Sequence, residues 1–161
     1  MTEPIRLRFE VDCSPDEAFR VWTERASDWW PADHTVSGEA GGEVHFEPRR
    51  GGRIFERALD GREYEWGEIV TWEPAHRLSY RWHLRVDRAD ATEVEIVFRA
   101  VGDGRTRVDI EHRGWERLGA RATERRDANR GGWQTLLPHY VAASAARRTS
   151  GHMNGARRST A

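Results

Sequence analysis

The side chains best suited to acid–base or metal chemistry in this sequence are its seven histidines, His34, His45, His76, His83, His112, His139 and His152. No two of them stand at the H-x-x-x-H or H-E-x-x-H spacing with which a helix presents two imidazoles to a zinc ion. The single cysteine, Cys13, excludes an internal disulfide and a zinc cluster built on cysteines. We therefore expect no metal site and no cofactor.

His112 is the histidine whose position favours a functional role. It continues the alternation of Val108 and Ile110, which places its side chain on the inward face of a predicted strand. A buried histidine is usually a hydrogen-bonded part of the core. The other interpretation is a polar anchor or a general acid or base, since its ordinary pKa is about 6.5. Glu111 cannot assist it, because neighbouring strand residues point to opposite faces.

Aromatic side chains form a second group, suited to binding. Tyr80 and Trp82 follow the inward face of one predicted strand, and Trp133 and Tyr140 follow the apolar stripe of the last predicted helix. They either line a pocket with ring faces and polar tips, as ligand sites often do, or form a plain aromatic core. Trp66 is a further candidate, although its strand shows no clean alternation, so the sequence does not indicate which side of that strand faces inward.

Other signatures of catalysis do not occur in the sequence. There is no G-x-S-x-G elbow and no glycine-rich phosphate loop before a helix. Gly102-Asp103-Gly104 is better explained as the turn of a hairpin, because such turns need a positive φ. We assign no catalytic residue, apart from His112 as a candidate acid or base.

The elements that must position these residues are those of an α+β domain. Residues 5–11 alternate as a half-buried strand, and Ser14-Pro15-Asp16-Glu17 is a capping box with proline at the first helical position. A second short helical turn is expected before Pro31. Turn residues then separate six short strands, at 44–46, 53–59, 63–72, 77–86, 93–100 and 106–112.

Apolar residues at helical spacing predict a long final helix from about Trp115 to Ala146. Pro138 is expected to kink or break it. Gly131-Gly132 costs about 1 kcal/mol per glycine relative to alanine in a helix interior. The two glycines let the helix flex, let a ligand approach the helix backbone, or meet a local packing need. One helix cannot fill the concavity of a curved sheet of six to seven antiparallel strands, so we expect a pocket between them.

Composition narrows the functional classes. The 161 residues suit one domain, 1–146, followed by a basic tail, 147–161, that we expect to be disordered. The 26 basic residues, all arginine, are mixed with 27 acidic ones, so no face for nucleic acid is expected. No apolar run is long enough to span a membrane or to serve as a secretion signal, which predicts a cytoplasmic protein.

Six motifs spread along the chain, namely Tyr64-x-Trp66-Gly67-x-Ile69-x-x-Trp72-Glu73-Pro74, Arg77-Leu78, Tyr80-x-Trp82, Thr106-Arg107-Val108, Glu111-His112-x-Gly114-Trp115 and Gly132-Trp133. Together they resemble the START/Bet v 1-like (SRPBCC) superfamily, and within it the branch named for the activator of heat-shock protein 90 ATPase. The resemblance spans about residues 5–146. It implies a helix-grip fold with a cavity beneath the long helix, in a superfamily of lipid carriers, polyketide cyclases, ligand sensors and co-chaperone domains.

We predict from these observations a domain that binds a small, apolar or amphipathic molecule between the sheet and the long helix. The candidate ligand-binding residues are Tyr80, Trp82, His112, Trp133, Tyr140 and Trp66. One alternative is a cyclase- or dehydratase-like enzyme that uses His112 on a polyketide-type substrate. Another is a chaperone ATPase activator or other protein-interaction module. A homodimer is compatible with the sequence, which does not require one.

Overall fold

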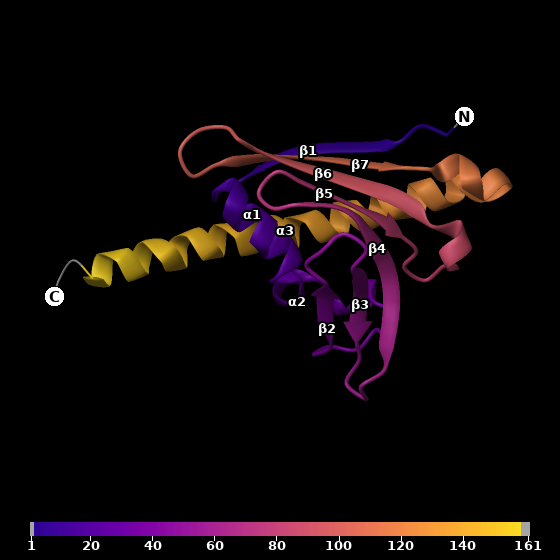
Figure 1. Ribbon diagram of the computed structural model, residues 1–161, viewed down its shortest axis with the longest axis horizontal. Helices are drawn as coiled ribbons and strands as arrows, with labels where there is room; N and C mark the ends of the chain where they lie inside the picture. The colour runs from indigo at the N-terminus through magenta and orange to yellow at the C-terminus, as the bar shows by residue number, and fades with distance from the viewer. Residues whose placement is uncertain (1, 159–161) are drawn as a thin grey trace.

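Seven antiparallel strands form one continuous sheet in the order β1-β7-β6-β5-β4-β3-β2 (Figure 1). The structure, a computed structural model, describes the backbone of residues 2–158 and the side chains of residues 2–146. The strands are β1 Ile5–Val11, β2 Glu43–Phe46, β3 Arg53–Arg57, β4 Glu63–Glu73, β5 Arg77–Trp82, β6 Thr92–Ala100 and β7 Thr106–Arg113.

The two faces of the sheet differ in polarity, as the alternation predicts. Along β6 and β7 every second side chain is buried against the core. The outward positions carry ion pairs between strands: Arg8 lies 2.5 Å from Asp109, and Arg113 lies 3.0 Å from Glu95. One apolar face and one charged face are thus confirmed, and the core lies on the apolar, concave side.

Two short helices and one long helix cover the concave face. The first, α1 (Pro15–Thr23), begins after Ser14, whose Oγ accepts a hydrogen bond of 3.2 Å from the backbone N–H of Glu17, so Ser14 is confirmed as the N-cap of the predicted capping box. It is followed by α2 (Ala26–Trp29). The long helix, α3 (Ala122–Arg158), runs the length of the molecule and packs against α1, α2 and β1 (Figure 1).

The long helix begins later than predicted, and it is not broken by its proline. Residues Trp115–Arg121 form a separate 3₁₀ segment, η3, because Gly119 takes the non-helical angles φ 57° and ψ −124°. Pro138 lies inside α3 on its exposed side. The carbonyl that loses its partner there, four residues earlier, is open to water, so the helix can continue.

The helix also ends beyond its predicted end. It continues to Arg158, whereas apolar spacing places the end at about Ala146. The side chains of residues 147–161 lie outside the described part of the chain, so the basic, disordered tail stays a prediction.

The strand β4 carries a β-bulge in each of its two pairings. Trp66 is the extra residue opposite β3, and Val70 is the extra residue opposite β5. Each extra residue shifts the in-and-out alternation by one position. Trp66 and Ile69 are therefore both buried, which explains why the inward face of this strand cannot be read from its sequence.

Aromatic side chains fill one end of the concavity. The ring of Tyr140 on α3 lies 4.7 Å from that of Trp22 on α1 and 5.1 Å from that of Trp29 on α2. Tyr80 of β5 packs edge-on against Phe46 of β2, with ring centroids 5.9 Å apart. The other end of the concavity is bordered by the loops that follow α2 and β5, which contain the 3₁₀ segments η1 (Ala32–His34) and η2 (Arg88–Asp90).

Candidate functional site

A cavity of about 200 Å³ lies between the end of β5 and the first half of the described part of α3. Three indoles form its apolar walls: Trp30 follows α2, Trp82 ends β5, and Trp133 projects from α3. The rings of Trp30 and Trp82 lie 5.9 Å apart at an angle of 53°. Leu84 and Leu136 extend this apolar surface. Flat aromatic walls of this kind suit a flat apolar guest.

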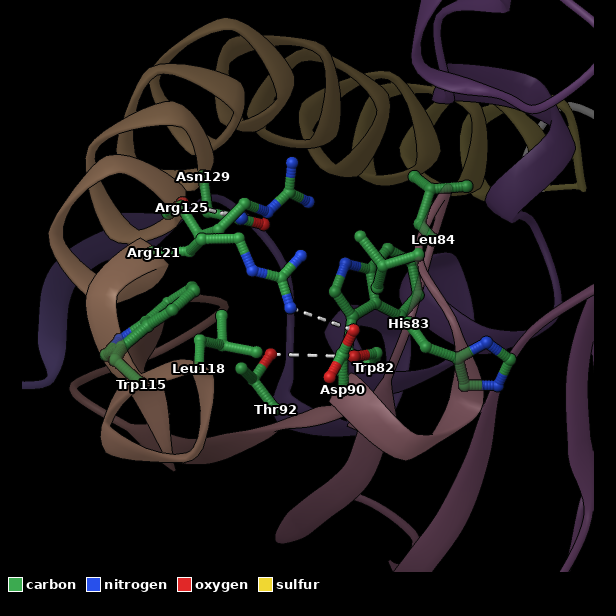
Figure 2. Close-up of a pocket in the computed structure, with 11 residues that line it drawn as sticks. Trp82, His83, Leu84, Asp90, Thr92, Trp115, Leu118, Arg121, Arg125 and Asn129 are labelled. Atoms are coloured by element: carbon green, nitrogen blue, oxygen red, sulfur yellow. Dashed lines mark hydrogen bonds and ion pairs between the residues drawn. The ribbon is translucent and has the colours of Figure 1, made fainter.

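Polar side chains lie among these apolar walls. His34 comes from η1, Arg85 from the loop after β5, and Arg125 and Asn129 from α3. The last two also line an adjoining hollow of about 20 Å³, where Figure 2 shows them projecting from the helix on the side of Trp82. The amide of Asn129 donates to the carbonyl of Arg125 at 2.8 Å, which fixes its orientation on the helix. The cavity therefore combines apolar walls with polar groups that can orient a guest.

Of the predicted binding residues, Trp82 and Trp133 line this cavity. The other four are fully buried core side chains, namely Tyr80, Tyr140, Trp66 and His112. The hydroxyl of Tyr140 donates to the carbonyl of Ala18 at 2.7 Å, and burial raises the pKa of this phenol and of Tyr80 above the usual range, so both stay neutral. A ligand would contact these four only if the core opened.

His112 is held between two hydrogen-bonding neighbours. The indole N–H of Trp133 donates to its Nδ1 at 3.0 Å, and its Nε2 lies 2.6 Å from Oγ1 of Thr92. Because an indole can only donate, Nδ1 accepts and the ring proton is assigned to Nε2. Burial lowers the pKa of His112 to about 3, so the ring is neutral near pH 7. These contacts favour a structural role, in which His112 holds Trp133 on the cavity wall.

A buried carboxylate, which no sequence pattern indicates, holds the loop after α2. Glu56 of β3 is 2% exposed. It accepts hydrogen bonds from the backbone N–H of Val36 at 2.6 Å, the hydroxyl of Ser37 at 2.7 Å and the indole N–H of Trp66 at 3.2 Å. A buried carboxylate with several donors is well satisfied. Trp66 thus acts behind the cavity, by helping to fix this loop.

The loop after β5 is joined to the same segment by Arg85. Its Nε donates to the carbonyl of Thr35 at 2.9 Å, and its Nη2 donates to the carbonyl of Asp33 at 2.7 Å. Arg85 has a φ of 63°, which is unfavourable for a residue with a Cβ and persists where surrounding contacts hold it. This turn ends β5 at Trp82, whereas the alternation predicted a strand up to residue 86.

Several residues of the cavity were not predicted from the sequence. Trp30, His34, Arg85 and Arg125 come from loops and from a helix face that carry no motif. Because the chain has 26 arginines, the sequence does not distinguish an arginine beside a cavity from one exposed to solvent. Asn129 did carry a signal, because it is a polar residue on the apolar stripe of the predicted helix.

Elsewhere the described residues offer weaker candidates. A broad, open hollow of about 490 Å³ between β1 and α3 is lined by apolar side chains such as Leu7, Phe9, Leu137 and Val141. Among the described residues, no three His, Cys, Asp or Glu side chains are grouped so that they could hold a metal ion. None of the described helices combines the length and the apolar character that crossing a membrane requires.

Comparison with known proteins places this architecture among relatives. The family model described as "Activator of Hsp90 ATPase homolog 1-like protein" matches residues 12–143. The solved structure of an anthrahydroquino-γ-pyrone synthase, Txn09, is 35% identical, with a TM-score of 0.58, over 76% of this chain and 84% of its own. The self-sacrificing resistance protein CalC from Micromonospora echinospora is 25% identical, with a TM-score of 0.64, over 90% and 93%.

A third solved structure shares the fold alone. The Aha1 dimer from Colwellia psychrerythraea is 14% identical, with a TM-score of 0.63, and the match covers 89% of this chain and 96% of that one. A search among curated proteins finds no match.

Proposed function

This chain belongs to the activator of Hsp90 ATPase homolog 1-like family, and we propose that it binds a small, planar aromatic molecule in the cavity between β5 and α3. The observation that carries the proposal is the wall formed by the indoles of Trp30, Trp82 and Trp133. Ring faces contribute stacking and burial without requiring a particular substituent, so they fit a guest of fused rings.

The helix side of the cavity adds to this argument. Gly132 lines the cavity, and a Cβ built on it would meet nothing within 4 Å. A flat ring can therefore approach the backbone of α3 at this point, which a larger side chain would prevent. The packing alternative for Gly132 has no neighbouring atom to support it. Two relatives, a synthase of a fused-ring product and a resistance protein, are named for roles that accord with a small-molecule partner.

The proposal is tested with 9-anthracenemethanol, a neutral molecule with three fused rings. We expect it to quench the tryptophan emission saturably, because it would lie against three indoles of the cavity. In the variant Trp82→Leu, binding should weaken by about tenfold, which corresponds to about 1.4 kcal/mol of lost stacking and burial. Fluorescence titration measures both affinities.

A matched control is Trp72→Leu. Trp72 is also partly buried on the sheet but packs on Phe19, with ring centroids 5.1 Å apart, and is no part of the cavity wall. Its replacement should leave the affinity unchanged. Absence of saturable quenching in the wild type, or equal weakening by both replacements, would refute binding in this cavity.

A second candidate function is proton transfer on the bound molecule, and His34 favours it. His34 lines the cavity, and its Nδ1 lies 2.9 Å from Oδ1 of Asp33. The hydrogen bond from His34 lowers the pKa of Asp33, so this carboxylate stays ionised, keeps Nδ1 protonated and leaves Nε2 as a base. His34 therefore replaces His112 as the candidate base of the enzyme alternative, because His112 is buried and hydrogen-bonded at both ring nitrogens.

The enzyme candidate predicts that the protein accelerates deuterium exchange at C10 of anthrone. Nε2 of His34 would take the C10 proton while the electron pair moves to the carbonyl oxygen, and the reverse step in D₂O would deliver deuterium. We expect His34→Gln to lower the NMR exchange rate by about 100-fold, the lower end for general base catalysis, and to leave anthrone binding unchanged. An exchange rate equal to that of buffer would exclude this candidate and leave the binding proposal standing.

A further inference from the structure

The charges that face the cavity are of one sign. Its lining contains the guanidinium groups of Arg85 and Arg125, and no carboxylate among the residues that the structure describes. Asp33 lies behind His34 with its side chain 81% exposed, so its charge is largely screened by water. The rim of an otherwise apolar cavity is therefore cationic.

The two arginines differ in how their donors are used. The guanidinium of Arg85 donates to the carbonyls of Thr35 and Asp33, which holds the rim together but does not neutralise its charge. In the part of the chain described here, the side chain of Arg125 has no hydrogen bond or ion pair. Arg125 therefore has all of its donors available to a guest.

A neighbouring arginine, in contrast to Arg125, has an ion-pair partner for its guanidinium group. Arg121, one turn before Arg125, lies 3.2 Å from Oδ2 of Asp90. Figure 2 shows Arg121 turned toward Asp90 and joined to it by a dashed line, whereas no dashed line joins the guanidinium of Arg125 to another of the residues drawn. Arg121, beside the small hollow, is thus neutralised by Asp90. Arg125 lies at the edge that the hollow and the cavity share, and its guanidinium group is free.

We infer that the ligand carries an anionic group, such as a carboxylate or an ionised phenol, and that Arg125 binds this group while the rings occupy the aromatic cavity. This inference rests on the proposed function and adds the chemical class of the ligand, a planar aromatic acid. A charge-assisted hydrogen bond from a half-buried arginine is stronger than one between neutral groups, and a guanidinium can bind a carboxylate through two N–H groups. The amide of Asn129, fixed one turn further along the helix, lies beside the same position.

The test compares two probes of the same shape, anthracene-9-carboxylate and 9-anthracenemethanol. We expect the wild type to bind the carboxylate about tenfold more tightly than the alcohol, the usual scale for a hydrogen bond to a charged group. Arg125→Gln should remove this preference and leave the affinity for the alcohol unchanged. Raising the salt concentration should weaken binding of the carboxylate only.

Arg130→Gln is the matched control, because it makes the same change of charge on an exposed position of the same helix, away from the cavity. It should retain the preference. Equal affinity for both probes in the wild type, or a preference that survives Arg125→Gln, would overturn the anionic ligand and leave the aromatic cavity intact as a proposal. Failure of both probes to bind would overturn the two proposals together.

Discussion

Replacing Gly132 by leucine should make the protein more stable and weaken its binding of 9-anthracenemethanol by more than tenfold. Gly132 lies in the interior of α3, where glycine costs about 1 kcal/mol relative to a good helix former. A Cβ at this position would meet nothing within 4 Å, so a side chain can be added without strain. The same side chain would occupy the space in which the ring of the ligand is proposed to lie.

Gly131→Leu provides the matched comparison. Gly131 is exposed, is also free of neighbours within 4 Å of an added Cβ, and does not line the cavity. Both variants should raise the melting temperature by about 2–4 °C, the shift expected for about 1 kcal/mol in a chain of this size. Only Gly132→Leu should weaken the titrated affinity, by more than tenfold. If both variants bind as the wild type does, the ligand does not approach α3 at Gly132.

Lowering the pH from 7 to 5 should reduce the free energy of unfolding by about 2 kcal/mol through His112 alone. Burial lowers the pKa of this imidazole to about 3 in the folded protein, whereas it is about 6.5 in the unfolded chain. The unfolded state therefore binds a proton that the folded state does not. The stabilisation is complete above about pH 6.5 and is lost progressively as the pH falls toward the folded pKa.

Urea unfolding at several pH values measures this slope, and the window above pH 5 avoids the titration of most carboxylates. His112→Gln should reduce stability at pH 7 but remove most of the pH dependence, since glutamine does not titrate. His76→Gln, at an exposed position, should leave the slope as it is in the wild type. In the wild type the NMR shifts of the His112 ring should stay constant from pH 7 to 5, and a titration near pH 6.5 would disprove the buried, neutral imidazole.

The link between His112 and Trp133 connects this stability effect to the cavity. The imidazole accepts the only hydrogen bond that the indole can donate, at 3.0 Å, and so fixes the position of one aromatic wall. His112→Gln should therefore weaken ligand binding less than Trp82→Leu does. The first change only displaces the indole of Trp133, whereas the second removes the indole of Trp82.

Local patterns were sufficient for most of the fold. The alternation along β6 and β7, the capping box at Ser14 and the helical spacing after residue 115 each reflect the chemistry of a few neighbouring residues. The β4 strand could not be read in this way, because its two bulges arise from pairing with β3 and β5, which lie elsewhere in the chain. The start of α3 was missed for a local reason, the non-helical Gly119.

The candidate site was predicted only in part, because periodicity gives the face of a side chain but not its depth. Tyr80 and Trp82 share one face of β5, and Trp133 and Tyr140 share one stripe of α3. In each pair one member lines the cavity and the other is in the core. Depth is decided by α1 and α2, whose aromatic side chains fill one end of the concavity and leave the other end open.

The pattern of residues along the chain is enough to predict the α+β class, the polarity of the two faces of the sheet and the aromatic character of the space beneath the long helix. Where that space stays open, and which charges face it, depends on how the elements pack in three dimensions. Arg85 and Arg125 reach the same cavity from segments 40 residues apart in the sequence. No local pattern encodes such a meeting, because it depends on how two loops and a helix pack around side chains contributed by the whole chain.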